Sequence, residues 1–441
     1  MTGFLLALGY TALLLYFMRR MRFFNAVPGL SFRWLSGIFL LKIAAGTALW
    51  AIYTYVYPDR LTADVFKYFD DSAPMFNALY TEPADYFRMV FGIGNDTEAF
   101  WWKYYKEMNN WERAFESNLY NDSHTIIRFN AVVRLFSFGE FHVHTVVAAF
   151  LALTGLLGIY RAFVTSLVGL ERVLMAVVFL LPSVLFWASG VIKESLLFFG
   201  MGLLVYQVSY FLVVRWRWWD PFLLLFTVAM LFFLKFYVLL SLTPALILLA
   251  WARRADRPAL WLKALLVYGF FILVGLNLQR VFPGWDILGI LTMKQRDFVG
   301  LAVLMDSGSF VMPTLLLPDV WLFASQAPYA LYIALAGPLV HGGGGALGLI
   351  AGAENAGFLL FLFGCFMFRG PWRKLDHALF FSMLFYVLLL ALIIGYTTPV
   401  MGAVVRYRTP LLPFLMIAGL LILDKDRIVN KWPWIRPLLS T

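Results

Sequence analysis

About eleven apolar stretches, most of them long enough to cross a bilayer, run through this 441-residue chain and leave little room for any other fold. A membrane-spanning helix needs roughly 20 apolar residues, because it rises 1.5 Å per residue through a hydrocarbon core about 30 Å thick. Only 14% of the residues are charged, against roughly 25% in soluble domains. We therefore predict an all-α polytopic membrane protein with about 11 transmembrane helices and a large outer loop.

The predicted spans divide the chain into five regions. The spans cover residues 3–18, 34–56, 142–163, 172–190, 195–214, 220–235, 236–252, 260–278, 345–368, 376–397 and 409–424. The regions are an N-terminal transmembrane hairpin (1–56), an acidic and aromatic outer loop with amphipathic interfacial helices (57–141), transmembrane helices 3–8 (142–278), a second outer loop with interfacial or re-entrant helices (279–344), and transmembrane helices 9–11 with a short cytoplasmic tail (345–441). The two shortest spans flank Lys235 and are predicted to form one helical hairpin.

Basic residues alternate between loops and so predict the orientation. Cytoplasmic loops are enriched in Lys and Arg. Six loops share this enrichment: they carry Arg19, Arg20, Arg22 and Arg33; Arg161 and Arg172; Arg215 and Arg217; Arg253, Arg254, Arg257 and Lys263; Arg369, Arg373 and Lys374; and Lys425, Arg427 and Lys431. We expect the N-terminus outside and the C-terminus in the cytoplasm. The net charge of +10 then faces anionic lipid headgroups, and no nucleic acid is expected as a partner.

Four cations break this orientation rule, because they lie at the outer ends of apolar helices. They are Lys193, Lys235, Arg406 and Arg408. A charge at the centre of a span costs roughly 2.5–3.5 kcal/mol during insertion. We interpret these side chains as an outer-face site for an anionic group, and arginine suits phosphate because its planar fork binds two oxygens. The alternatives are a local Lys193–Glu194 ion pair and arginines that reach outward to lipid headgroups.

Carboxylates at the start of the first outer loop are the candidate catalytic residues. Helical spacing from Asp64 places Tyr68 and Asp71 on one face of a predicted interfacial helix. Asp70 lies beside them, and Glu354 is an acid inside a span, which is a functional hypothesis by default. Acids and rings together suit a carbohydrate. The alternative is a solvated amphipathic loop whose aromatic residues rest on lipid headgroups.

Several other chemistries lack the residues that they need. The chain has no phosphate-binding loop of the GxxxxGK[ST] type and no glycine-rich dinucleotide motif, so we expect no cofactor and leave a divalent metal open. His142 and His144, two residues apart, point to different sides of a helix, and no metal ligands are assigned. The single Cys365 excludes an intramolecular disulfide. The glycine run 342–345 is either an anion-binding turn or a flexible start to a helix.

Two short motifs resemble those of bacterial membrane proteins that assemble polysaccharides. Residues 182–194 read PSVLFWASGVIKE and are similar to a "PSxxFWxSGxxKE" segment, while residues 406–414 read RYRTPLLPF and are similar to an "RYRxPxxPF" segment. The segment around Asp64 resembles the acidic first large outer loop of GT-C-fold glycosyltransferases. It is also similar to that of the exopolysaccharide and O-antigen polymerase group. One departure is that the acidic loop of GT-C enzymes usually follows the first span, whereas here it follows the second.

The resemblance implies a polyprenyl-phosphate-dependent glycosyltransferase in the bacterial cytoplasmic membrane. Its partners would be a polyprenyl-phosphate-linked sugar donor, a glycan, lipid or protein acceptor, and membrane lipids. Lys193, Lys235, Arg406 and Arg408 would bind the donor phosphate, and Asp64, or else Asp70 or Asp71, would accept the proton of the acceptor hydroxyl. The supporting residues would be Glu194, Tyr68, Tyr237, Glu354 and Tyr407.

Two other functions fit the same pattern. One is a polymerase that joins lipid-linked oligosaccharides, and the other, of a different class, is a transporter or flippase for lipid-linked sugars. The flippase lacks the matching Gly/Pro-interrupted spans typical of inverted repeats. Geometry separates the classes: in an enzyme, Asp64 (or Asp70/Asp71), Lys193 and Arg406 converge on one outward-opening cavity. In a transporter, polar residues continue across the midplane.

Overall fold

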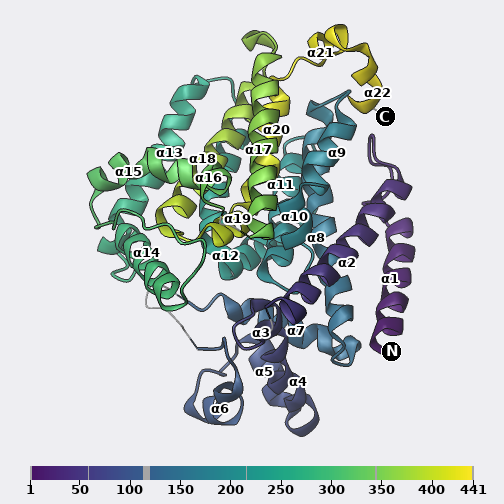
Figure 1. Ribbon diagram of the computed structural model, residues 1–441, viewed down its shortest axis with the longest axis vertical. Coiled ribbons are helices and arrows are strands. Elements are labelled where there is room, and N and C mark those ends of the chain that lie inside the picture. Colours follow the sequence, from purple (N-terminus) through teal and green to yellow (C-terminus); the bar gives the residue numbers. More distant parts are fainter. Residues whose placement is uncertain (1, 58, 113–119, 215, 343–344, 440–441) are drawn as a thin grey trace.

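The computed structural model describes residues 2–57, 59–112, 120–214, 216–342 and 345–439, and these residues are almost entirely helical. Within these ranges the backbone forms no strand, and its only β-type pairing is three isolated bridges. Long helices form an upright bundle, and a set of short helices hangs from one end of it (Figure 1). The chain is therefore an all-α membrane protein, as the sequence predicts.

Eight of the described helical segments are long and apolar enough to cross a membrane. They are α2 (Phe32–Tyr55), α8 with its extension (Phe141–Ser166), α11 (Lys193–Phe211), α12 (Asp220–Arg254), α13 with its extension (Leu260–Arg280), α17 (Ala346–Met367), α18 (His377–Thr397) and α19–α20 (Met401–Ile422). The predicted first span corresponds to α1 (Thr2–Arg20) and the predicted span 172–190 to two short helices, α9 (Glu171–Phe179) and α10 (Pro182–Trp187). The count of about eleven spans stays a prediction.

Helix α12 is broken at Lys235, where the sequence predicts the turn of a hairpin. Lys235 has φ −154° and ψ 82°, far from helical values. The half before the break lies along α11, where Thr227 bonds to Gln207 (3.3 Å). The half after it runs along α18 and ends where Arg253 pairs with Asp376. Because α11 begins and α18 ends near Lys235, both halves lead away from the same end of the bundle, and the chain reverses at this residue.

Glycines set the position of α11 against α8. A Cβ atom built on Gly155 would lie 1.9 Å from the carbonyl oxygen of Phe198, and one on Gly202 would lie 1.8 Å from that of Gly155. Small residues let membrane helices approach this closely, because no side chain separates the two backbones. The first turn of α11, which carries Lys193 and Glu194, is thereby fixed against α8.

The described residues between 57 and 141 fold into short helices at one end of the bundle, which we call the loop face. These helices are α3 (Asp64–Asp70), α4 (Ser72–Thr81), α5 (Pro83–Phe91), α6 (Glu98–Lys103), the 3₁₀ turn η1 (Tyr105–Glu107) and α7 (Ser123–Ser137). The N-terminus lies at this end and the C-terminus at the opposite end, beside α21 (Lys425–Lys431) and α22 (Arg436–Leu439) (Figure 1).

The basic loops gather at the end opposite the loop face. Arg161 donates to the carbonyl oxygen of Phe23 (2.9 Å), and Lys425 donates to that of Val168 (2.9 Å). Arg427 reaches the carbonyl oxygen of Arg369 (2.9 Å). Loops that are far apart in the sequence but share a basic composition therefore lie side by side.

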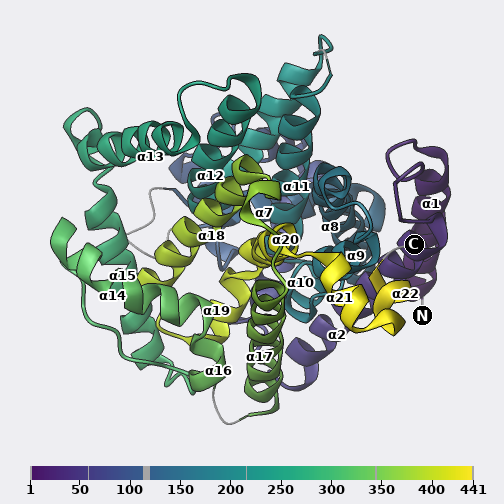
Figure 2. The same ribbon diagram turned by 90° about the horizontal axis from the view of Figure 1, so that it is seen from above.

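The second predicted outer segment forms α14 (Ile287–Leu304), α15 (Val320–Leu335) and α16 (Gly337–His341). Helices α13 to α16 lie along one side of the bundle (Figure 2). Gln295 joins α14 to α18, because its buried side-chain amide donates to the carbonyl oxygens of Thr314 (3.1 Å) and Tyr396 (2.9 Å). Within the glycine run 342–345, residues 343 and 344 lie outside the described residues, as does the anion-binding turn predicted there.

Candidate functional site

A cavity of about 220 Å³ opens at the loop-face end of the bundle, between α3, the residues just before α7, α11, α12, α14, α18 and α19. We call it the central cavity. Its polar lining consists of Asp64, Asp122, Lys193, Lys235, Lys294 and Arg406, the tyrosines Tyr68, Tyr120, Tyr237 and Tyr407, and the threonines Thr397 and Thr398. These residues come from segments up to 342 positions apart in the sequence. The fold therefore brings together the acid of the first outer loop and three of the four predicted phosphate-binding cations.

Arg406, in α19 (Met401–Tyr407), is the centre of the charge network. Its Nε donates to Oε1 of Glu194 (2.8 Å) and its Nη2 to Oε2 (3.0 Å), while its Nη1 donates to Oδ2 of Asp64 (2.7 Å). Glu194 is 0% exposed and also accepts a bond from Nζ of Lys235 (2.9 Å). A buried carboxylate is tolerated when its charge is paired and its oxygens are bonded, and Glu194 meets both conditions.

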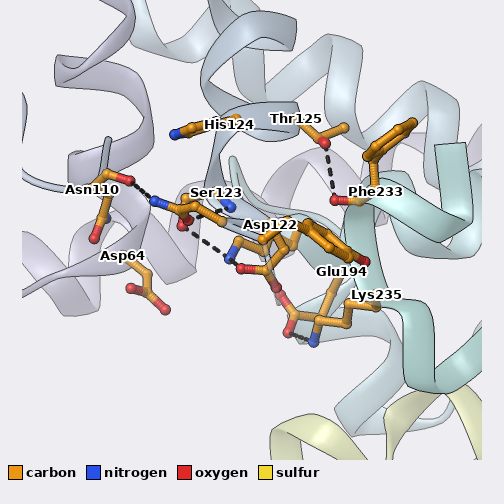
Figure 3. Close-up of polar contacts among 12 residues, drawn as sticks. Asp64, Asn110, Asp122, Ser123, His124, Thr125, Glu194, Phe233 and Lys235 are labelled. Carbon is orange, nitrogen blue, oxygen red and sulfur yellow. Dashed lines mark hydrogen bonds and ion pairs between the residues drawn. The ribbon is translucent and has the colours of Figure 1, made fainter. Parts of the chain in front are cut away.

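Local structure explains why these charges lie at this depth. Glu194 is in the first turn of α11, where the helix dipole favours a negative charge. Lys235 lies at the break in α12, so its side chain leaves the helix at the cavity. Carbonyl groups freed by the break bond to the loop face. Thr125 donates to the carbonyl oxygen of Phe233 (3.0 Å; Figure 3), and the hydroxyl of Tyr120 donates to that of Phe232.

Asp64 is the accessible carboxylate on Arg406. It begins α3, and its side chain is 37% exposed, compared with 0% for that of Glu194. Burial by itself raises the pKa of Asp64, but the charge of Arg406 and the hydrogen bond from Arg406 outweigh this and lower the pKa below its usual range. Asp64 is therefore ionised in this state.

A second ion pair joins the loop face to α11. Nζ of Lys193 donates to Oδ1 of Asp122 (2.7 Å) and to Oγ of Ser123 (3.1 Å), and it lies 5.2 Å from the ring centre of Tyr68. Asp122 directly precedes α7. The side chain of Asn121 fixes the preceding loop, because its amide donates to three consecutive carbonyl oxygens, from Asn110 to Glu112 (2.7–2.9 Å). Figure 3 shows Asp122, Glu194 and Lys235 together, with Asp64 to one side of them.

The opposite wall of the cavity is apolar. Helix α14 contributes Ile287, Ile290, Leu291 and Phe298, and α18 contributes Ile393 and Ile394. These α14 positions recur every three or four residues or multiples of that spacing, so one face of the helix lines the cavity. Lys294 shares that face, and burial lowers its pKa. The cavity thus has one wall that suits an anion and one that suits a hydrocarbon chain.

Two tyrosines of the cavity contact Lys235. Nζ of Lys235 lies 4.8 Å from the ring centre of Tyr407 and 5.9 Å from that of Tyr237. Cation–π contacts of this kind stabilise a charge by roughly 0.5–2 kcal/mol. Two of the predicted supporting tyrosines therefore hold the lysine that pairs with Glu194.

Two of the candidate acids lie away from the cavity. Asp70 accepts two hydrogen bonds from the exposed Arg60, from Nε to Oδ2 (2.8 Å) and from Nη2 to Oδ1 (2.7 Å). Asp71 is buried and accepts the backbone N–H groups of Asn109 (2.8 Å) and Asn110 (2.7 Å), and burial raises its pKa despite these bonds. Since α3 ends at Asp70, the seven-residue spacing from Asp64 crosses a helix boundary and does not bring Asp71 to the same site.

Arg408 and Glu354 also lie outside the cavity lining. Arg408 is 1% exposed; its Nη1 bonds to Oδ1 of Asn355 and to the carbonyl oxygen of Ala334 (3.4 Å). Among the described residues, its Nε and Nη2 find no hydrogen-bond partner. Glu354 accepts the backbone N–H of Ser183 (2.6 Å) and its hydroxyl, and so holds the N-terminal end of α10. Both side chains serve contacts between helices.

No three His, Cys, Asp or Glu side chains gather as a metal site among the residues that the structure describes. The two histidines of the 142–144 segment turn to different surroundings. His144 bonds to Asn130 (2.7 Å) and Ser137 (2.8 Å), while the ring of His142 packs on Phe4 and Trp50.

Several aromatic rings of the first outer loop pack against one another. Tyr105 stacks on Trp111 at 4.3 Å, and Trp111 stacks on His124 at 3.9 Å. The exposed rings include those of Tyr80 and Trp102. Tyr68 and Tyr120 are the rings of this loop that face the cavity, so most of its aromatic residues stabilise the loop rather than line the site.

The sequence analysis did not single out Asp122, Tyr120 or Lys294. Asp122 precedes an apolar helix, where an aspartate normally caps the helix N-terminus. In the structure it makes no such bond and pairs with Lys193 instead. Only the folded structure shows that the Asp122 carboxylate does not cap its own helix. The sequence alone therefore could not identify Asp122 as a residue of the cavity.

A scan of protein-family models and searches of curated proteins and of solved structures find no match to this chain.

Proposed function

We propose that this protein is an integral membrane glycosyltransferase of the GT-C type, which moves a sugar from a polyprenyl-phosphate-linked donor to an acceptor. The proposal rests on one observation. Asp64, Lys193 and Arg406, which the sequence motifs nominate independently, line a single cavity that has both a charged and an apolar wall. A carrier needs an anion site but no general base, whereas a glycosyl transfer needs an anion site and a general base.

The donor would bind with its phosphate against Arg406, Lys193, Lys235 and Lys294 and its hydrocarbon tail along α14. Asp64 would accept the proton of the acceptor hydroxyl while the hydroxyl oxygen attacks the anomeric carbon. The bond between that carbon and the phosphate oxygen then breaks. Polyprenyl phosphate leaves with the electron pair, and the cations stabilise its charge.

Turnover with defined donors tests this proposal. The purified protein is incubated with polyprenyl-linked sugars that differ in sugar and in phosphate number, and released polyprenyl phosphate and pyrophosphate are measured. We expect release from a monophosphate-linked sugar, and loss of release in the Asp64→Asn variant. Asp70→Asn is the matched control, because it makes the same change outside the cavity. Release of polyprenyl pyrophosphate alone, without polyprenyl phosphate, favours the polymerase that joins lipid-linked oligosaccharides.

The site is expected on the outer face of a bacterial cytoplasmic membrane, with the N-terminus outside. Cysteine labelling in spheroplasts tests this orientation. Asn95 is a poor position, since its side chain is buried and bonded to Tyr105; Ala99 is exposed on the same loop. A cysteine at Ala99 should react with an impermeant reagent in intact spheroplasts, and one at Asn430 only after lysis. The native Cys365 is buried. The reverse pattern would place the site in the cytoplasm.

A transporter for lipid-linked sugars is the second candidate, because a further set of polar contacts lies inside the bundle. Arg408 with Asn355 and Glu354 with Ser183 extend polar groups beyond the central cavity. Proteoliposomes that contain a lipid-linked sugar but no acceptor separate the two functions. Movement of the lipid between leaflets, with no glycosyl product when acceptor is added, would show that the protein is a carrier and not a glycosyltransferase.

A further inference from the structure

Two carboxylates share the guanidinium of Arg406, but they hold it in different ways. Glu194 uses both oxygens, is fully buried and binds a second cation, Lys235. Asp64 uses one oxygen on Nη1, and its side chain is 37% exposed on the helix of the loop face. The Asp64 contact can therefore open without leaving a buried charge unpaired, whereas the Glu194 contact cannot.

The same arrangement recurs at Lys193. Its partner Asp122 is 38% exposed and also belongs to the loop face. Each accessible carboxylate of the central cavity thus occupies a cation that an anionic ligand would use. In both pairs the carboxylate is the partner that reaches solvent, so it can leave the cation for water when a ligand anion takes its place.

We propose that a phosphate group entering the cavity replaces Asp64 on Nη1 of Arg406 and thereby frees the Asp64 carboxylate to act as the base. The identity of that phosphate as the donor's own rests on the proposed function. The exchange is favoured because a phosphate presents several oxygens to the planar fork of arginine, while Asp64 presents one.

This exchange would couple donor binding to the activation of the base. While it is bonded to Arg406, Asp64 is a weak proton acceptor, because the neighbouring positive charge stabilises its ionised form. After the exchange it has lost that cation and gained a phosphate as neighbour, and both changes raise its basicity. The base would thus be held inactive until a donor is present.

Binding of farnesyl phosphate tests the exchange without requiring turnover. Asp64→Asn removes the competing charge, so farnesyl phosphate should bind roughly 2- to 5-fold more tightly than to the wild-type protein. Farnesol, which has the same tail and no phosphate, should bind both proteins equally. Asp70→Asn is the matched control and should leave both affinities unchanged. Equal or weaker binding of farnesyl phosphate to folded Asp64→Asn protein overturns the proposal.

Carbodiimide labelling of the unmodified protein gives a second test that does not depend on a variant. Labelling of Asp64, measured by mass spectrometry, should increase when farnesyl phosphate is added, because the carboxylate leaves Arg406. Labelling of Asp70 should stay constant. A decrease at Asp64 would mean that phosphate binds over an intact Asp64–Arg406 pair, which contradicts the exchange.

These outcomes separate this inference from the function. Tighter binding to Asp64→Asn together with increased labelling, but no sugar transfer with any donor, supports the exchange and refutes the glycosyltransferase. Sugar transfer that depends on Asp64, with neither farnesyl phosphate binding nor Asp64 labelling changed in the expected direction, supports the glycosyltransferase and refutes the exchange. No binding of farnesyl phosphate at all overturns the phosphate site and the exchange together.

Discussion

Arg406 and Arg408 lie two residues apart but in opposite surroundings. Arg406 bonds to two carboxylates and lines the central cavity. Arg408 is fully buried, bonds to an amide and a carbonyl oxygen, and keeps two nitrogen atoms without a hydrogen-bond partner. The same residue type therefore lines a cavity at one position and is packed between helices at the other. The presence of a cation near a helix end does not by itself identify a ligand-binding group.

The largest expected effect is that of Arg406 substitutions on turnover. Arg406→Ala should lower turnover by roughly 10²–10³-fold, the usual loss when one preorganised charge-stabilising donor is removed. Arg406→Lys should restore only part of it, since a point charge cannot replace the planar fork. Initial rates are measured on protein that elutes as a folded, monodisperse species.

A substitution of Arg408 is compared with those of Arg406 in the same turnover assay. Replacing a buried, incompletely paired charge by an apolar side chain of similar size is often neutral or stabilising. Arg408→Met should therefore keep turnover within about threefold of wild type and leave the melting temperature unchanged or higher. Loss of turnover in folded Arg408→Met protein would remove the distinction between the two arginines.

The next largest expected effect on turnover is that of replacing Asp64. Asp64→Asn should lower turnover by roughly 10²-fold, because the base loses its proton affinity. Asp70→Asn only disrupts an exposed ion pair with Arg60, which is worth about 0–1 kcal/mol, and should leave turnover unchanged. Equal rates in wild type and Asp64→Asn would exclude the first-loop acid as the base.

The pH dependence of turnover should show the state of Asp64. The charged and titratable groups that face it are Arg406, Lys193, Glu194, Tyr53, Tyr68 and Tyr407. Since Arg406 lowers the pKa of Asp64 in the free protein, the acidic limb of kcat/KM should lie at low pH. The limb of kcat, which reports the donor complex, should lie at higher pH after the exchange. Coincident limbs would mean that Asp64 keeps its pairing with Arg406.

The smallest expected effect is that of Glu354. Its carboxylate accepts both the N–H and the hydroxyl of Ser183, and Glu354→Gln retains only one acceptor oxygen. The free energy of unfolding should fall by about 1–3 kcal/mol, seen as a lower melting temperature, with turnover per folded molecule unchanged. A large loss of turnover would extend the site toward the interior of the bundle.

Local patterns predicted the helical class, the common location of the basic loops and the break at Lys235, because each depends on composition or charge within a short segment. They also nominated Asp64, Lys193, Lys235 and Arg406 separately. The contacts that join these side chains span up to 342 residues and have no local signature. Only their shared position at one end of the helices indicated that they would meet.

The differences between expectation and structure have equally local causes. Positions two apart on a helix point about 200° apart. His142 and His144 are separated in this way within α8, whereas α19 ends one residue before Arg408. Asp71 was grouped with Asp64 by helical spacing, but α3 ends before it. Its carboxylate instead anchors the backbone of Asn109 and Asn110.

The pairing of Glu194 with both Lys235 and Arg406 has a consequence for biogenesis. Lys235 follows Glu194 by 41 residues, so the two charges can neutralise each other soon after synthesis, as one helical hairpin enters the bilayer. Arg406 follows 212 residues after Glu194. At 5–20 residues per second it is synthesised about 10–40 s later. Once Lys235 is made it can neutralise Glu194, and the charge network is completed only when the last of the described membrane segments brings Arg406.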